Sequence, residues 1–537
     1  MESTAKSPAD ESPVDRSSTA ERTPFQDRVF LGLIVAGVLL AWFARFVQDD
    51  AFISFIYARN LAEGLGPTWF GERIEGYTNF LWMLWMSLGF RLGIEPVLFS
   101  QVSGIALFTL FLCLAFELGR RHGGDAVGRL TVLLLVGNVS VVSYATGGLE
   151  TMLQAVLLTA ALLLDRRPLA LSIVLLLALM TRLDSAAIGF FIGCAALWRF
   201  RDDFRSLVAL VLPVGLGVAL WFGWKLWYYG DPLPNTFYAK VSGLNWVGFL
   251  FLYRFLHWYA LWPFLLLALR GASGLGRLLA LLLLWCAYVV WVGGDFMEFR
   301  FVIPVASLLM VVVASLMHRH LRAWPRRLGI ALLIAASLLH GLRFRHVTPD
   351  RTLDSLTSLG TFYDTYAERP WSSIGGTLAE NLEGLDVRIA LHPVGAIPFY
   401  SRLDTIDMYG LNDAWVARNG DELGDGWVRP GHQRFAPWEY LLERQVDLVL
   451  GDVQLLESGS LGTPGATGAV RRLMISSRPT AKEPLPRARV VAMPLGDGQS
   501  LLMLQARPNP PLEERMVELG WELIDVQARP SQIPEAP

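Results

Sequence analysis

A series of long apolar runs begins near residue 29 and continues to about residue 344. A membrane-spanning helix needs about 20 apolar residues, and the pattern predicts about eleven such helices, several of them short and nearly fused. The predicted segments lie near residues 29–47, 97–118, 127–143, 150–164, 168–181, 185–198, 207–228, 251–269, 277–292, 300–317 and 328–344.

Polar segments precede, interrupt and follow this series of apolar runs. Residues 1–27 are rich in Ser, Thr, Pro, Asp and Glu, which is typical of a disordered tail. The loop 48–96 is dense in polar and aromatic residues, and its apolar part 80–93 is too short to span, so we expect that part to lie at the membrane interface. After about residue 346, short strand-like runs alternate with turn signals and helical patterns. They are found at 387–394, 446–453 and 500–506.

The fold class that follows is an α-helical polytopic membrane protein with a C-terminal soluble α/β domain. We predict a cytoplasmic tail (1–27), a transmembrane domain (28–345) with a first outer loop (48–96), and a soluble domain (346–537). The composition agrees, because 53% of the residues are hydrophobic and only 18% are charged, whereas soluble domains average about 25% charged. The formal charge of −2 argues against a nucleic-acid partner.

Basic residues set the orientation of the predicted helices. If the N-terminus is cytoplasmic, the inner loops contain 14 Arg in 38 residues, and the outer segments contain 6 Lys or Arg in 90 residues. Cytoplasmic loops carry an excess of Lys and Arg. The sequence therefore predicts a multi-pass protein of the cell inner (plasma) membrane with its N-terminus in the cytoplasm and its C-terminal domain outside.

Five segments with ionisable residues then lie on the outer side. Charged groups near a membrane are costly and are usually functional. The candidate site residues are Asp49, Asp50, Arg59, Glu75, Tyr77, Asn79, Glu150, Arg182, Asn235, Lys240, Asp295 and Arg300.

These residues also have structural interpretations. Asp50 suits the N-cap of a helix that begins at Ala51. Glu150 suits the positive end of a helix dipole, and Arg182 would form an ion pair with Asp184. Five segments converging on one face by accident is the less favoured interpretation.

The chemistry of this set fits transfer from a lipid phosphate. A carboxylate accepts the proton of an acceptor hydroxyl, and Lys or Arg neutralises the charge that develops on a phosphate leaving group. On position and charge, the candidates for the donor phosphate are Arg59, Arg182, Lys240 and Arg300. The candidates for acceptor binding or support are Glu75, Tyr77, Asn79, Glu150, Asn235 and Asp295.

The stretch DDAFISFIYARNLAEGLGPTWFGERIEGYTNFLW (49–82) resembles the first periplasmic loop of GT-C-fold glycosyltransferases that use polyprenyl-phosphate sugars. The resemblance is greatest to the terminal arabinofuranosyltransferases of mycobacteria (AftB) and their bacterial relatives. It extends to GGLETML, GDPLPNTFYAK, GGDFMEFRF and GAIPFYSRLDTIDMYGLND (395–413). The resemblance implies a multi-pass enzyme with an outer active site in which the acidic pair, here Asp49 and Asp50, is essential.

Two roles for this acidic pair stay open: that of a catalytic base and that of a nucleophile. We predict Asp49 as the catalytic acid and Asp50 as its partner; the alternative is that one of them only caps the following helix. No cofactor is assigned, and a divalent metal ion beside the acidic pair is left open.

The function implied is transfer of a sugar, with arabinofuranose favoured, from a polyprenyl-phosphate donor to an envelope glycan. The expected partners are the lipid bilayer, the lipid-linked donor and a glycan acceptor, with the oligomeric state left open. Alternatives are a transporter or flippase for a lipid-linked precursor, a non-catalytic scaffold that binds polysaccharide, and an enzyme for protein O-glycosylation or lipid A modification.

Overall fold

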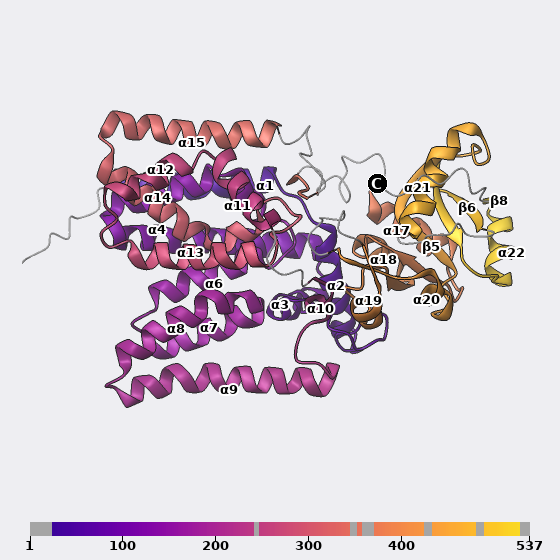
Figure 1. Cartoon of the computed structure of the whole chain (residues 1–537), viewed down its shortest axis with the longest axis horizontal. Helices are drawn as coiled ribbons and strands as arrows, with labels where there is room; N and C mark the ends of the chain where they lie inside the picture. Colours follow the sequence, from indigo (N-terminus) through magenta and orange to yellow (C-terminus); the bar gives the residue numbers. More distant parts are fainter. Residues whose placement is uncertain are drawn as a thin grey trace, which may run out of the picture.

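The structure is a computed structural model that describes residues 24–240, 246–343, 352–356, 370–423, 432–478 and 488–526. A bundle of long helices occupies one part of the molecule, and a smaller α/β domain lies beyond one end of it (Figure 1). Residues 1–23 of the predicted tail and the predicted domain boundary at 345/346 lie outside the described residues.

A helix occupies each of the eleven predicted apolar segments. The bundle helices are α1 (Pro24–Phe43), α4 (Pro96–Val136), α6 (Thr151–Leu163), α7 (Pro168–Thr181), α8 (Ala186–Phe200), α9 (Phe204–Tyr229), α11 (Trp246–Trp258), α12 (Trp262–Leu265), α13 (Gly276–Trp291), α14 (Ala306–His320) and α15 (Ala323–Arg343). Helix α4 covers two predicted segments, because its backbone leaves helical geometry at Gly123 and Gly124 (φ 73°) and splits it into two arms. Gly119 and Gly128 bring these arms together, since a Cβ on Gly119 would lie 2.9 Å from the Gly128 Cα.

Fewer helices are long and apolar enough to cross a membrane than the eleven that the sequence predicts. Within the described residues there are five, or six if a pair bent by 91° counts as one span: Pro96–Val136, Leu183–Phe200, Phe204–Tyr229, Arg300–His320, Ala323–Leu342 and the pair Trp246–Trp258 with Trp262–Arg270. The apolar helices α6, α7 and α13 have only 13, 14 and 16 residues, short of the roughly 20 that a straight span needs. Several helices of this length and apolar character are typical of a multi-pass membrane protein.

Burial separates inner from outer helices. In the segment Arg300–His320, which contains α14, 89% of the most apolar stretch is buried inside the molecule. In α9 only 11% of the corresponding stretch is buried. Trp227 and Leu220 of α9 are exposed, and a helix that shows an apolar outer surface is suited to lipid.

Short elements complete the helical part of the chain. They are α2 (Asp49–Ala62), α3 (Phe80–Arg91), α5 (Val139–Ser143), α10 (Asn235–Lys240) and the 3₁₀ turns η1 (Leu183–Ser185), η2 (Leu266–Arg270) and η3 (Arg300–Val305). Figure 1 shows α2, α3 and α10 grouped beside α18 and α19 of the C-terminal domain.

The C-terminal domain is built on a six-stranded sheet in the order β2-β1-β5-β7-β6-β8. Strands β2, β1 and β5 are parallel, and β7, β6 and β8 pair antiparallel. The sheet strands are β1 (Arg388–Leu391), β2 (Asp404–Asp407), β5 (Leu448–Glu457), β6 (Ala488–Pro494), β7 (Gln499–Gln505) and β8 (Glu522–Val526), and a small ribbon pairs β3 (Asp421–Glu422) with β4 (Arg434–Phe435). The predicted α/β domain is confirmed, and its three strand-like runs fall on β1, β5 and β7.

Helices connect these strands, in order α17 (Trp371–Asn381), α18 (Ala396–Ser401), α19 (Ala414–Asn419), α20 (Trp438–Glu443), η4 (Pro464–Ala466), α21 (Thr467–Ser477) and α22 (Pro510–Glu518). Helix α18 packs on α2 through aromatic rings, with Phe52 5.3 Å from Phe399 and 5.7 Å from Tyr400. The Trp69 indole of the first loop donates to the Thr405 carbonyl at 2.8 Å. The C-terminal domain therefore packs directly on the first loop.

Candidate functional site

A cavity of about 470 Å³ lies at the end of the bundle where the first loop meets the C-terminal domain. Its polar lining comes from separate parts of the chain: Asp50, Ser54, Tyr77, Thr78, Asn79, Glu150, Arg182, Asp184, Thr236, Tyr288, Asp295 and Arg300. Most of the remaining wall is apolar and includes Leu149, Leu183, Leu233, Phe237, Trp291, Phe296, Phe301 and Leu411. Of the residues predicted from the sequence, the structure brings together Asp50, Tyr77, Asn79, Glu150, Arg182, Asp295 and Arg300.

The two adjacent acids face different partners. Asp49 and Asp50 open α2, and neighbouring residues of a helix point about 100° apart. The Asp49 carboxylate accepts from the backbone N–H groups of Ala396 (2.7 Å) and Gly395 (3.0 Å) at the start of α18. Asp50 lines the cavity. The structure thus gives Asp49 a contact with the other domain and places Asp50 at the cavity.

The environment of Asp49 favours its neutral form. Burial raises its pKa to about 7; the Ala396 and Gly395 N–H groups oppose this rise, and the neighbouring Asp50 charge adds to it. The carboxyl group therefore titrates near neutral pH.

Two buried arginines form the cationic part of the lining. The Arg182 guanidinium contacts Glu150 at 2.6 Å and Asp184 at 2.8 Å. Arg300 contacts Asp295 at 2.6 Å. Both guanidinium groups lie against the Phe301 ring, at 5.5 and 5.4 Å from its centroid. The predicted pair Arg182–Asp184 exists, and Arg300 is paired with Asp295, so both arginines have a structural role as well as a place in the cavity wall.

The charges around the cavity do not add up to a positive field. The lining holds four carboxylates, Asp50, Glu150, Asp184 and Asp295, against two arginines. Each guanidinium has five N–H donors in a planar fork, more than the carboxylate contacts use. An anion here would be held by these remaining N–H groups.

Ser54 and Tyr288 are cavity residues that the sequence analysis did not select. Ser54 lies one helical turn after Asp50, on the same face of α2. Its hydroxyl donates to the Asn79 side-chain oxygen (3.0 Å), and the Asn79 amide donates to Glu150 (2.7 Å). The i, i+4 spacing from Asp50 was the available signal for Ser54. Tyr288, which donates to Asp184 at 3.2 Å, lies inside an apolar run and offered none.

Glu75 lies outside the cavity wall and forms a buried ion pair with Lys225 of α9 at 2.8 Å. The ammonium also lies 5.0 Å from the Trp221 ring and 5.2 Å from the Phe222 ring. Burial raises the Glu75 pKa to about 7, and Lys225 opposes the rise. The pair joins α9 to the segment that carries Tyr77 into the cavity.

Three other predicted residues lie away from the cavity wall or outside the described atoms. Arg59 donates to the Phe399 carbonyl at 2.8 Å and covers the Phe399 ring at 4.8 Å. Asn235 donates to the carbonyls of Gly410 (2.7 Å) and Leu411 (3.1 Å). Both hold the C-terminal domain, whose Leu411 is part of the cavity wall. The Lys240 side chain lies outside the described part of the chain.

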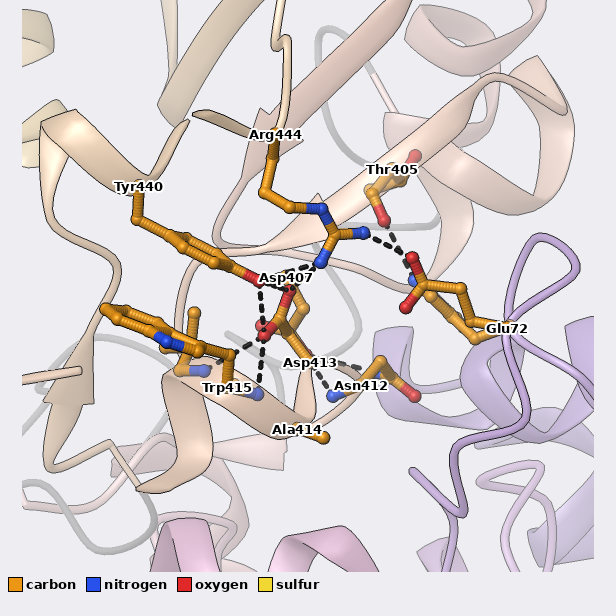
Figure 2. A network of polar contacts seen from close by, with 12 residues as sticks. Glu72, Thr405, Asp407, Asn412, Asp413, Ala414, Trp415, Tyr440 and Arg444 are labelled. Carbon is orange, nitrogen blue, oxygen red and sulfur yellow. Dashed lines mark hydrogen bonds and ion pairs between the residues drawn. The ribbon is translucent and has the colours of Figure 1, made fainter. Parts of the chain in front are cut away.

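The segment 395–413 of the C-terminal domain is held by a polar network (Figure 2). Asp413 caps α19 and accepts from the Tyr440 hydroxyl at 2.8 Å. Arg444 contacts both Asp413 and Glu72 of the first loop, and Figure 2 shows it between the two acids.

A second branch of this network reaches the cavity. Asp407 accepts from the Asn412 backbone (2.9 Å) and side chain (3.0 Å). The Asn412 oxygen accepts from the Tyr57 hydroxyl at 3.1 Å, and that hydroxyl accepts from the Gly76 N–H at 3.1 Å. The C-terminal domain thereby supports residues 76–79, which line the cavity.

Metal binding has no geometric support in the described residues. No group of three or more His, Cys, Asp or Glu side chains among them is arranged to hold a metal ion.

The solved structures similar to this chain include ArnT from Cupriavidus metallidurans bound to undecaprenyl phosphate. That match has 13% identity and a TM-score of 0.55, and covers 91% of this chain and 99% of that chain. The apo state of the same protein matches with 15% identity and a TM-score of 0.52, covering 89% and 98%. The apo oligosaccharyltransferase from Archaeoglobus fulgidus matches with 10% identity and a TM-score of 0.47, covering 92% and 76%.

The matches to ArnT extend over both the helical bundle and the C-terminal domain. The chain therefore has the overall fold of ArnT, and the GT-C fold class expected from the resemblance is confirmed. Residues 361–483 match a family described as a domain of unknown function (DUF8728). No curated protein matches the sequence.

Proposed function

We propose that the protein is a membrane glycosyltransferase that takes a sugar from a polyprenyl-phosphate donor in the cavity beside Asp50. The observation that carries the proposal is the meeting of a carboxylate and two buried arginines in one largely apolar cavity at the end of a GT-C bundle. ArnT, which shares the fold, was solved with undecaprenyl phosphate bound. This supports a lipid-linked donor for the present chain.

The proposed reaction is a displacement at the anomeric carbon of the donor sugar. The acceptor oxygen forms a bond to this carbon while the bond from the carbon to the phosphate oxygen breaks. Asp50 takes the hydroxyl proton, and the electron pair of the broken bond stays on the polyprenyl phosphate. The N–H groups of Arg182 and Arg300 that the carboxylate contacts do not use stabilise the charge that develops there.

The remaining predicted residues have supporting roles in this proposal. Asn79 and Glu150 form one polar wall with Ser54, and Asp295 orients Arg300. We place Asp49 as a positioning residue, which reverses the order of roles predicted from the sequence. Lys240 is kept as a candidate for the donor phosphate on charge alone.

Arabinofuranose remains the favoured sugar and an envelope glycan the favoured acceptor, both from the resemblance of the first loop. The proposal also keeps the division into tail, transmembrane domain and outer domain. The cavity then lies on the extracytoplasmic side of the inner membrane. The excess of arginine in the inner loops supports this orientation.

The test uses the purified full chain with a panel of polyprenyl-phosphate sugars and measures release of polyprenyl phosphate. Asp50→Asn keeps the size of the side chain but loses the base, so we expect release to fall by about 10²- to 10⁴-fold with the melting temperature unchanged. The matched control is Asp202→Asn, at an 87% exposed side chain between α8 and α9, which should behave as wild type. Full activity of Asp50→Asn with every donor that the wild type uses would overturn the proposal.

A further inference from the structure

The C-terminal domain carries a second group of polar and aromatic residues that the proposed reaction does not use. His392, Tyr409 and Asp452 directly follow, or lie within two residues of, the parallel-paired parts of β1, β2 and β5. Strand β1 lies between the other two; the chain passes from β1 to β2 on one side and later returns past β1 to form β5 on the other. In open sheets with parallel strands, ligands bind at the carboxyl ends of the strands where the order reverses in this way.

The His392 ring is held in one tautomer and has an unused nitrogen. Its Nδ1 lies 2.9 Å from the Asp452 carboxylate, which only accepts, so Nδ1 carries the proton. Nε2 is then an acceptor; it is buried, in a side chain that is only 6% exposed, and it has no hydrogen-bond partner among the residues that the structure describes. An unpaired buried polar atom costs about 1–3 kcal/mol, so the site is suited to a ligand that supplies a hydroxyl donor.

A row of rings connects this histidine to the main cavity. Tyr409 lies 4.7 Å from His392, and His432 lies 4.6 Å from Tyr409. His432 in turn lies 5.1 Å from Phe296, which lines the cavity. The backbone gives a second connection, because Gly395, three residues after His392, donates to Asp49 beside the cavity residue Asp50.

We propose that His392, Tyr409 and His432 form the subsite for the glycan acceptor, an inference that rests on the proposed function. A sugar hydroxyl donates to His392 Nε2, and the apolar C–H face of the ring packs on Tyr409. The partly exposed Tyr409 ring lies against the His392 ring at 45°, and in this proposal the Tyr409 side chain turns when the sugar binds. An anionic ligand does not fit, because Nε2 offers no proton and Asp452 carries a negative charge.

The test separates the acceptor from the donor in the full chain. The variants are His392→Ala, which removes the acceptor nitrogen, and Asp452→Asn, which removes the carboxylate that fixes the histidine tautomer and whose side chain is 63% exposed. His257→Ala, at an exposed histidine of α11, is the matched control. The measurements are the KM for linear oligosaccharides of arabinofuranose, galactofuranose and mannose, and donor hydrolysis without an acceptor.

We expect His392→Ala to raise the KM for the oligosaccharide that the wild type uses by about tenfold, the loss of one hydrogen bond. Asp452→Asn should raise it less, and donor hydrolysis should not change in either variant. An unchanged KM in both variants would overturn the acceptor subsite while leaving the proposed function intact.

Direct binding gives a readout that does not need turnover. Saturation-transfer NMR of the full chain with the same oligosaccharides should show binding in wild type and the His257→Ala control, and loss in His392→Ala. If the wild type binds polyprenyl phosphate but none of these oligosaccharides, the subsite is wrong; if it binds no polyprenyl phosphate either, the proposed function fails as well.

Discussion

At the scale of residues, the acidic pair shows how one helix start serves two purposes. Asp49 accepts two N–H groups of α18, and Asp50 lines the cavity. A carboxylate bonded to the start of another helix also meets the positive end of a helix dipole, although α18 has only six residues and contributes little by itself. Asp49 therefore sets the position of Asp50 by fixing the first turn of α2.

We expect Asp49→Asn to differ in kind from Asp50→Asn. An amide accepts with one oxygen only and turns an NH₂ group toward the other backbone N–H, so the variant should lose about 1–3 kcal/mol of stability. Release of polyprenyl phosphate should fall only partly. Thermal unfolding and donor release, measured on both variants, check this. A stable but inactive Asp49→Asn together with an active Asp50→Asn would reverse the two roles.

The sequence predicted which segments supply the site better than which side chains do. Charged residues at the ends of apolar runs identified Glu150, Arg182 and Arg300, because burying a charge there is costly without a purpose. Lys225 was missed, since it lies within the apolar run of α9 and its partner Glu75 is 150 residues away. Pairings between distant segments leave no local pattern in a single sequence.

At the scale of elements, the apolar runs predicted every bundle helix, because a run of apolar residues is a local property. The lengths were less predictable. Helices α6 and α7 end at Leu163 and Thr181, where connections lead to the next helix. The bend of 91° between α11 and α12 also follows from packing that the hydropathy pattern does not contain. The contact of α18 with α2 joins segments more than 340 residues apart.

A close approach between α2 and the start of α18 predicts a sensitive position. A Cβ on Gly395 would lie 2.0 Å from the Asp49 carbonyl oxygen, so Gly395→Ala forces the two domains apart. We expect a loss of roughly 1–3 kcal/mol of stability and a fall in donor release. Gly376→Ala, on α17 of the same domain, is the control, because its Cβ would meet nothing within 4 Å. Equal melting temperatures for the two variants would contradict the docking of α18 on α2.

At the scale of the whole molecule, the cavity depends on both domains. Leu411 forms part of its wall, and the Tyr57–Asn412 contact supports residues 76–79 from the other side. Arg59, Asn235 and the Glu72–Arg444 pair hold the same junction. The C-terminal domain is therefore part of the site, and a test of either domain alone would not report on it.

This junction should make the stability of the whole chain depend on pH. Burial raises the pKa of Asp49 and of Glu75 to about 7, and that of Asp407 to about 6. A carboxyl group with a raised pKa holds its proton more tightly in the folded state, so its stabilising contribution is present at low pH and is lost as pH rises through the folded pKa. Carboxyl groups with a lowered pKa, such as Asp203, titrate below this window.

We therefore expect the melting temperature to fall between pH 5.5 and pH 8, as these three groups are forced to ionise while buried. Asp49→Asn removes one titrating group, so its melting temperature should change less over the same range. The exposed substitution Asp202→Asn serves as the control and should keep the slope of the wild type. A melting temperature that is constant or rises from pH 5.5 to pH 8 would show that these carboxyl groups are solvated, and that the two domains do not close over Asp49 as the contacts with Gly395 and Ala396 require.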